Sequence, residues 1–168
     1  MKDLIIRGGH NIDPTMVEAA FERHPAVSAA VAVSQPDAYA GEVVACYIAL
    51  ASNCTATVDE ITAAAKDHIT ERPAWPKNVY VVDAMPMTVV GKIYRPALRA
   101  DAAARVLEPL LKSVAAGTLL SVTIEPGGKR GLEATVMLRS ASEDLQRAVS
   151  AELDKFVLGY RIEVDDTR

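Results

Sequence analysis

The chain has 168 residues, half of them apolar, and carries a formal net charge of −4 at pH 7. This length allows one domain, or one domain with a small addition. The acidic balance argues against a nucleic-acid surface, which is normally basic, and no apolar run approaches the ~20 residues of a membrane span. The N-terminus lacks the apolar stretch of a secretory signal, and Cys46 and Cys54 match no metal or redox spacing. We therefore expect a cytoplasmic protein without a metal site.

The N-terminal part predicts a glycine turn followed by a helix. Two short extended segments flank the turn at residues 7–11. Asp13 is a suitable N-cap, and Pro14 fits the first helical position because its missing N–H needs no partner there. The helix is expected to end at residues 24–25, because a proline disfavours the helical conformation of the residue before it.

The next segments predict the main sheet and its helices. Apolar runs at residues 27–33 and 42–50 indicate strands, and their continuity is typical of a sheet covered by helices. A Thr-x-x-Glu capping-box pattern predicts a helix over residues 58–70. A strand at residues 78–83 and a helix at residues 96–111 complete this part of the chain.

The last part of the chain, residues 112–168, predicts a strand–strand–helix–strand unit. Apolar and polar residues alternate in two segments, as in half-buried strands, and glycines between them indicate a hairpin. Ser140 and Glu143 suggest the capping box of a helix, and a final alternating strand follows. A segment this short buries little core alone, so we expect it to dock on the rest of the chain or on a partner chain, which allows a homodimer.

The predicted fold class is therefore α+β. It comprises a small mixed sheet of three or so strands and an N-terminal hairpin, flanked by helices, in a domain at residues 1–111. A β-β-α-β appendage follows at residues 112–168.

One glycine–lysine step, Gly91-Lys92, lies between the strand predicted at residues 78–83 and the helix predicted at residues 96–111. Gly91 allows a sharp turn because glycine has no Cβ to clash. Lys92 then projects from the tip of the turn as a mobile point charge with three donors, suited to reaching into an active site formed by another domain. On this step alone, a solvated surface lysine is the simpler interpretation.

Several motifs in the same order resemble the small C-terminal domain of adenylate-forming acyl-CoA ligases, the AMP-binding or ANL superfamily. The first is Lys-Asp-Leu-Ile-Ile-Arg-Gly-Gly-His-Asn-Ile at residues 2–12, with a Pro-x-x-Val-Glu helix start soon after it. The second is Pro-Met-Thr-Val-Val-Gly-Lys at residues 86–92, followed by a helix with arginines and a leucine. The resemblance covers about residues 1–107. The Gly-His-Asn-Ile turn is most similar to ligases of fatty or other carboxylic acids.

The resemblance implies an ATP-dependent ligase that joins a carboxylic acid to coenzyme A, with AMP and pyrophosphate as products. In such enzymes the lysine of the Gly-Lys step bridges carboxylate and phosphate oxygens during adenylation. Here that lysine is Lys92, supported in its loop by Thr88 and Gly91. Its role is electrostatic and positional, since two anions must meet before the acyl-adenylate forms.

The resemblance also assigns the glycine turn to thioester formation. In the family this domain rotates after adenylation, and the turn with Gly8, Gly9, His10 and Asn11 then faces coenzyme A. Glycine lets a pantetheine arm pass close to the backbone, although a tight hairpin that needs positive φ explains the two glycines equally well. For His10, an exposed turn histidine without chemistry is the simpler alternative.

Other residues match family positions with less specific roles. Lys2 aligns with the hinge residue, and a hinge needs a chain upstream to rotate against. Arg95 and Arg99 are candidates for a nucleotide phosphate or a larger domain, but ordinary solvated helix charges explain them better. Val89 and Val90 depart from the family, in which an Arg or Lys and a Ser often occupy these positions. Two glutamates at family positions have simpler explanations on a helix surface and a strand edge, respectively: Glu18 and Glu42.

A phosphate-binding loop and a carboxylate pocket are expected in a separate, large N-terminal adenylation domain, because this sequence contains neither. We therefore expect that the isolated chain does not form acyl-adenylate and binds no cofactor tightly. ATP, AMP, coenzyme A and Mg²⁺ are expected to act only in the full-length enzyme. Two alternatives stay open: a domain that loads a carrier protein instead of coenzyme A, and a non-catalytic binding or dimerisation module of the same fold.

Overall fold

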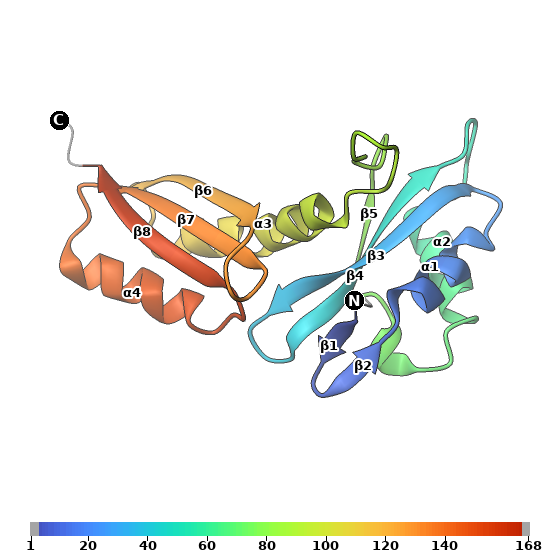
Figure 1. The fold of residues 1–168 in the computed structure, drawn as a ribbon, viewed down its shortest axis with the longest axis horizontal. Helices are drawn as coiled ribbons and strands as arrows, with labels where there is room; N and C mark the ends of the chain where they lie inside the picture. Colours follow the sequence, from blue (N-terminus) through green and yellow to red (C-terminus); the bar gives the residue numbers. More distant parts are fainter. Residues whose placement is uncertain (1–3, 166–168) are drawn as a thin grey trace. The chain divides into compact units, whose positions relative to one another are not determined.

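The computed structural model describes residues 4–165. Within them the chain forms four α-helices, one short 3-10 helix and eight strands (Figure 1). The chain divides into two compact units. The first runs to Gln35 and resumes over Glu42–Leu98, and the second comprises Pro36–Gly41 and the chain from Arg99 onward.

A five-stranded sheet forms the centre of the first unit. The hairpin strands β1 (Ile5–Arg7) and β2 (His10–Ile12) pair antiparallel, and β1 continues the sheet to β4 (Gly41–Leu50) and the edge strand β3 (Val27–Asp37). β5 (Asn78–Val81) pairs with β4 in parallel, so the sheet is mixed. The paired residues of β4 and β5 are Ala45 with Asn78, Cys46 with Val79, Tyr47 with Tyr80, and Ile48 with Val81.

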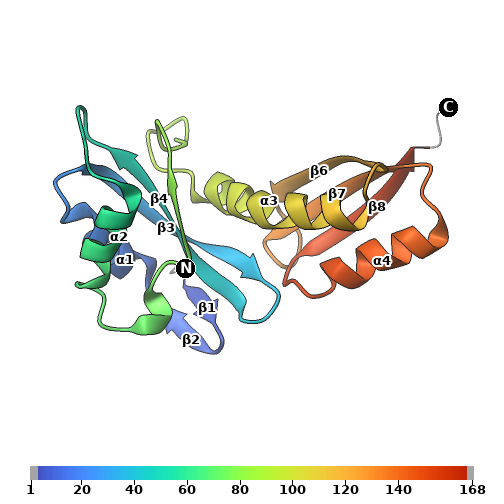
Figure 2. The same cartoon turned by 180° about the vertical axis from the view of Figure 1, so that it is seen from behind.

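Two helices cover one face of this sheet, α1 (Pro14–Glu22) and α2 (Val58–Lys66) (Figures 1 and 2). Asp13 caps α1, since its carboxylate accepts a backbone N–H at 3.0 Å. α2 begins with the predicted capping box, in which Thr57 and Glu60 each accept the other's backbone N–H. The helices and strands share one core: Val17, Ala20, Phe21, Ala30, Ala32, Val44, Cys46, Ile48, Ile61 and Ala65.

Strand β3 is longer than the sequence predicts, because a buried polar residue continues it. Gln35 is fully buried, and its amide donates to Tyr80 Oη at 2.9 Å and accepts from Asn78 Nδ2 at 2.6 Å. Both partners lie on β5. A buried amide is tolerated when its donors and acceptors are satisfied, so Gln35 can lie inside the strand.

The second unit is built on a helix and a three-stranded sheet. After α3 (Arg95–Val114) come the hairpin strands β6 (Leu119–Pro126) and β7 (Leu132–Arg139), then α4 (Glu143–Leu153) and β8 (Gly159–Asp165). β6 and β7 pair antiparallel, whereas β7 and β8 pair in parallel. Parallel neighbours need a crossover connection, and α4 supplies it.

The core of the second unit draws on α3 as well as on the tail. Ala103, Leu107 and Leu111 of α3 pack with the apolar face of β7 and with α4. The tail was expected to dock on the rest of the chain or on a partner chain to complete its core. The apolar face of α3 packs against it. The boundary predicted at residue 111 falls inside this continuous helix, whereas the compact units divide between Leu98 and Arg99.

The predicted α+β class is confirmed, including the N-terminal hairpin, the mixed sheet and the strand–strand–helix–strand tail. The predicted capping box of α4 was wrong in position. Ser142 caps the helix, and its hydroxyl accepts the Leu145 N–H at 3.3 Å. Ser140 instead has a φ of +44°, in the left-handed region that suits a turn. None of the helices among the described residues is long and apolar enough to cross a bilayer.

Candidate functional site

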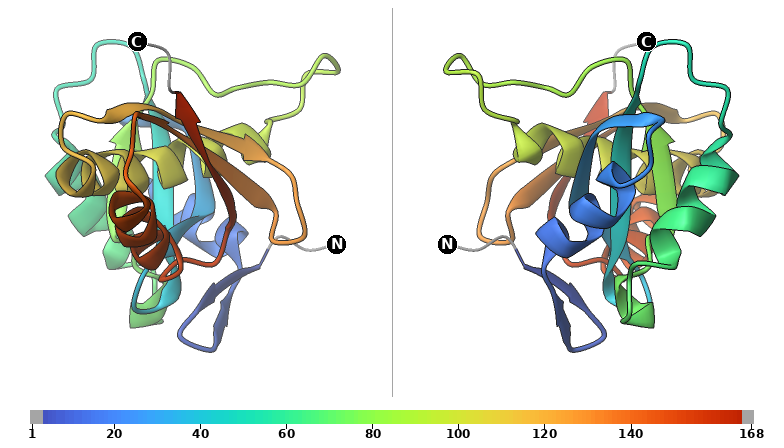
Figure 3. Two further views of the ribbon diagram at one scale, coloured as in Figure 1. Left: turned by 90° about the vertical axis from the view of Figure 1, so that its left-hand side faces the viewer. Right: turned by 90° about the vertical axis from the view of Figure 1, so that its right-hand side faces the viewer.

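Lys92 lies on a tight hairpin between β5 and α3, which projects from the first unit (Figure 3). Met87 and Ile93 form an antiparallel bridge near its base. One residue further out on each side, the Tyr94 N–H donates to the Pro86 carbonyl at 2.7 Å. The loop that carries the lysine is therefore an ordered extension of the backbone.

Thr88, Gly91 and Lys92 form the tip of this hairpin. The Thr88 N–H donates to the Lys92 carbonyl at 2.7 Å, and the Gly91 N–H donates to the Thr88 carbonyl at 2.9 Å. Gly91 has a φ of +75°, as in three-residue hairpin loops that end in a left-handed glycine. The Lys92 N–H also donates to Thr88 Oγ1 at 3.1 Å. Thr88 thus binds the backbone of the lysine through both its main chain and its side chain.

The side chains at this tip face solvent. Lys92 is exposed, and no ion pair or side-chain hydrogen bond of the described residues holds its ammonium group. Val89 is fully exposed, and the relative exposures of Val90 and Met87 are 75% and 55%. The exposed ammonium group of Lys92 is therefore flanked in the chain by apolar side chains that this unit does not bury.

Arg95, the first residue of α3, forms a bidentate ion pair with Glu18 of α1. Nη1 lies 2.5 Å from Glu18 Oε1, and Nη2 lies 3.0 Å from Oε2. Glu18 Oε1 also accepts the Ala32 N–H at 2.9 Å, and Arg95 Nη1 donates to the Ala32 carbonyl at 3.0 Å.

The prediction that Arg95 is a solvated helix charge was wrong, and so was the helix-surface role given to Glu18. Their side chains are only 25% and 12% exposed. The two residues are 77 positions apart in the chain, so no local pattern links them.

Gly8 and Gly9 form the two-residue turn between β1 and β2. Their φ values are +53° and +88°, which favour glycine at both positions. A Cβ built on either residue meets no atom within 4 Å, so backbone conformation and not crowding within the chain selects glycine here. His10 and Asn11 are exposed at the start of β2.

Two charged side chains fasten this hairpin to the rest of the unit. Arg7 Nη1 donates to the Pro73 carbonyl at 2.7 Å and to the Trp75 carbonyl at 3.3 Å, around the 3-10 helix η1 (Arg72–Ala74). Glu42 Oε2, on β4, accepts the Ile6 N–H of β1 at 2.9 Å.

The lysine hairpin and the glycine turn lie at opposite ends of the first unit (Figures 1 and 3). The structure therefore brings the predicted site residues into two separate groups. One holds Lys92, Thr88 and Gly91, and the other holds Gly8, Gly9, His10 and Asn11. Lys2, the predicted hinge, lies outside the described residues.

No metal cluster accompanies these groups in the described part of the chain, and one of the two cysteines lies in the core. No three His, Cys, Asp or Glu side chains of residues 4–165 are grouped so that they could hold a metal ion. Cys46 is fully buried in the core, as predicted. Burial raises the pKa of its thiol, and the negative charges of Glu18 and Glu22 raise it further, so the thiolate is disfavoured.

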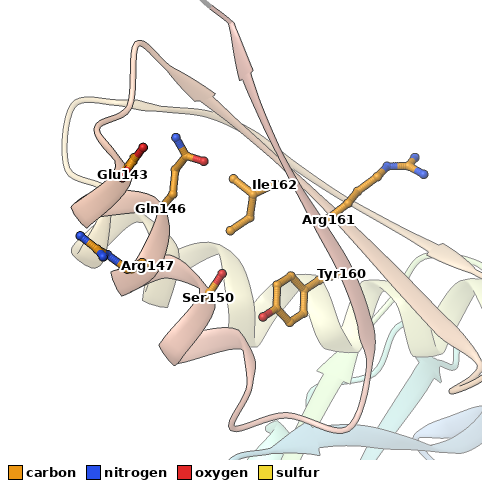
Figure 4. A pocket seen from close by; sticks show the side chains of 7 residues that line it. All are labelled: Glu143, Gln146, Arg147, Ser150, Tyr160, Arg161 and Ile162. Carbon is orange, nitrogen blue, oxygen red and sulfur yellow. The ribbon is translucent and has the colours of Figure 1, made fainter.

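The second unit has a surface hollow of about 480 Å³ between α4 and β8 (Figure 4). Tyr160 lines it and donates from Oη to Asp154 at 2.7 Å; this hydrogen bond raises the pKa of Tyr160. Arg161 points away from the hollow, on the other side of β8. Its Nε pairs with Glu163 Oε1 at 3.3 Å.

Comparison with known proteins adds a family and several relatives. Residues 16–92 match the family described as AMP-binding enzyme C-terminal domain. The chain is similar to marinolic acid–CoA ligase of Pseudoalteromonas sp., at 37% identity over 157 residues, 92% of this chain and 24% of that protein. It is also similar to medium/long-chain-fatty-acid–CoA ligase FadD8 of Mycobacterium tuberculosis, at 39% identity over 107 residues, 60% of this chain and 19% of that protein. The chain thus spans less than a quarter of these relatives, and the first similarity extends into the second unit.

Solved structures are similar to this chain over a comparable stretch. The acyl-CoA synthetase of Brucella canis matches with a TM-score of 0.54 and 33% identity, over 60% of this chain and 19% of that one. A fatty acyl CoA synthetase of Mycobacterium tuberculosis matches with a TM-score of 0.56 and 30% identity, over 62% of this chain and 20% of that one.

Proposed function

Because residues 16–92 belong to the AMP-binding enzyme C-terminal domain family, we propose that this chain is the C-terminal part of an ATP-dependent acyl-CoA ligase. The reaction joins a carboxylic acid to coenzyme A and converts ATP to AMP and pyrophosphate. A large adenylation domain binds ATP and the acid, and this chain contributes Lys92 and the glycine turn. The names of the relatives, which are coenzyme A ligases, support coenzyme A as the acceptor.

Lys92 serves the first half-reaction in this proposal. A carboxylate oxygen attacks the α-phosphorus of ATP, the acyl–phosphate bond forms, and the bond to pyrophosphate breaks. Negative charge is brought together as this happens, and a preorganised ammonium group stabilises it. The observation that carries this role is the exposed Lys92 at the tip of a hairpin whose backbone is held by its own hydrogen bonds.

The glycine turn serves the second half-reaction. The sulfur of coenzyme A attacks the acyl carbon, AMP departs with the electrons of the broken bond, and the thiol proton is released. Gly8 and Gly9 leave open space beside the backbone, which suits a pantetheine arm passing close to it. This turn and the lysine hairpin lie at opposite ends of the unit, which supports a scheme in which domain rotation brings them to one reaction centre in succession.

In this scheme, ATP and the Mg²⁺ that accompanies it belong to the adenylation domain. Lys2 is the hinge for the rotation. A homodimer through the second unit stays a separate prediction. Light scattering on the 168-residue chain checks it, and a mass of one chain at high concentration contradicts it.

The test measures the two half-reactions separately in the protein that joins this chain to its adenylation domain. Lys92→Ala should lower ATP–pyrophosphate exchange by roughly 10²–10³-fold, the loss typical of a deleted charge-stabilising donor. Conversion of supplied acyl-adenylate to acyl-CoA should change little. The matched control is Lys129→Ala, which removes an exposed lysine from the hairpin turn of the second unit. Equal loss of both half-reactions in Lys92→Ala contradicts the proposed role.

A further inference from the structure

The Glu18–Arg95 ion pair joins three elements of the first unit at one point. Glu18 lies on α1, Arg95 begins α3, and both side chains bind the backbone of Ala32 on β3. β3 is the edge strand of the sheet, so these contacts also satisfy an N–H and a C=O that no neighbouring strand reaches.

The geometry of this pair differs from that of the exposed ion pairs elsewhere in the chain. It is bidentate and mostly buried, whereas the Arg105–Asp101 pair further along α3 has side chains 44% and 46% exposed. Exposed pairs contribute little because water competes for both charges. A desolvated fork-to-carboxylate contact is directional and fixes the orientation of both partners.

Arg95 is also close in the chain to Lys92, the lysine proposed to act in adenylation. It follows Tyr94, whose N–H closes the base of the hairpin on Pro86, and it is three residues after Lys92. The other leg of the hairpin follows β5, and just after that strand the Val82 N–H donates to the Ile48 carbonyl at 3.0 Å. The sheet therefore holds one leg directly and the Glu18–Arg95 pair holds the other.

We propose that Glu18 and Arg95 are positioning residues that aim the Lys92 hairpin for adenylation. This inference rests on the proposed function of Lys92. The guanidinium group is engaged by Glu18 and Ala32, so it acts through the hairpin and not by contact with a nucleotide phosphate. We call the Glu18–Arg95 pair, with its contacts to Ala32, the clamp. Loss of the clamp frees the C-terminal leg of the hairpin, and Lys92 then samples positions away from the reacting atoms.

The first test needs only the 168-residue chain. Trypsin cleaves after an exposed lysine when the local backbone opens, so cleavage after Lys92 reports the order of the hairpin. Cleavage after Arg130, in the turn of the second unit, is the internal reference. Glu18→Gln should raise the ratio of the two cleavage rates by about tenfold. Asp101→Asn, which removes the exposed pair, should leave the ratio unchanged.

The second test separates positioning from stability in the protein that includes the adenylation domain. Glu18→Gln should lower ATP–pyrophosphate exchange by roughly 10- to 100-fold, as small misplacements of catalytic groups do. Formation of acyl-CoA from supplied acyl-adenylate should stay within about twofold. Arg95→Lys, which keeps the charge without the fork, should lie between wild type and Glu18→Gln.

A double variant guards against simple unfolding. Glu18→Gln leaves Arg95 partly buried without its carboxylate, whereas Glu18→Gln with Arg95→Met removes the charge and lets the new amide bind both backbone groups of Ala32. The double variant should regain thermal stability yet keep the adenylation defect. Normal adenylation in a stable double variant overturns the proposal, as does equal loss of both half-reactions in Glu18→Gln. If Lys92→Ala itself leaves adenylation intact, the proposed function fails instead, and a raised cleavage ratio would then show a clamp without a catalytic purpose.

Discussion

The backbone N–H of Lys92 donates to Oγ1 of Thr88 at 3.1 Å, so the side chain of one residue fixes the main chain of the other. The same Thr88 also exchanges main-chain hydrogen bonds across the turn. The direction in which Lys92 leaves the hairpin therefore depends on a hydroxyl group that is four residues away.

Thr88→Val should lower adenylation by about fivefold, because a net hydrogen bond of ~1 kcal/mol is lost while side-chain volume is kept. Initial rates of ATP–pyrophosphate exchange measure the effect in the joined protein. Thr88→Ser keeps the acceptor and should behave like wild type. A full-rate valine variant would mean that the main-chain contacts alone hold the turn.

Two glycines with positive φ should divide between the half-reactions. Gly91 has a φ of +75° and Gly9 a φ of +88°, and a Cβ in such a conformation costs roughly 1–2 kcal/mol. Gly91→Ala should impair adenylation, whereas Gly9→Ala should impair acyl-CoA formation from supplied acyl-adenylate. Each variant controls for the other, and the same pattern of loss in both contradicts the division of labour.

The apolar tip of the hairpin should matter for activity but not for the stability of this chain. Val89 and Val90 are exposed at 105% and 75%, so changing both to Ser removes no buried contact here. We expect the melting temperature to hold and adenylation to fall by about tenfold, because a tip that docks against the adenylation domain buries these side chains. Val157→Ser, at an exposed valine of the second unit, is the matched control. Unchanged adenylation would place the two valines in solvent throughout the reaction.

The hydroxyl of Tyr160 should lose its proton at a higher pH than an ordinary tyrosine, because its pKa is raised. Its pKa is raised mainly because the neutral hydroxyl donates to Asp154, with burial adding to the shift and a Ser150 contact opposing it. A raised folded-state pKa means that the contribution to stability is complete below the ordinary value near 10 and is lost as pH rises through the folded pKa. In Asp154→Asn, ultraviolet titration should show one of the five tyrosines moving to lower pH. Tyr160→Phe identifies that transition, and an unmoved tyrosine in Asp154→Asn contradicts the cause assigned here.

Short sequence patterns predicted the starts of helices α1 and α2 correctly. The Thr57 and Glu60 box marks the start of α2, and Asp13 and Pro14 mark the start of α1, because caps are formed by residues a few positions apart. The same logic misplaced the cap of α4, since two serines precede Glu143 and only backbone geometry distinguishes them. Ser142 is extended and caps, whereas the φ of Ser140 is positive.

Long-range partners were beyond the reach of sequence patterns. Glu18 and Arg95 each looked like a surface charge, because burial and pairing arise only when α1, β3 and α3 come together. The apolar run that predicted β3 ends at residue 33, and the hydrogen bonds of Gln35 with Asn78 and Tyr80 lie beyond any local pattern. The resemblance to a family marked Lys92 and the glycine turn as site segments, and their separation to opposite ends of the unit needed coordinates.

Helix α3 has a practical consequence for chimeric enzymes. Its first turn holds the base of the lysine hairpin through Arg95, while Leu107 and Leu111 complete the core of the second unit. A recombination junction after Leu111 would separate the strands and helix of the tail from the α3 side chains that complete their core. The α3 fragment would then expose an apolar surface, which favours aggregation. Exchanges between ligases should therefore transplant the helix whole, together with the strands that follow it.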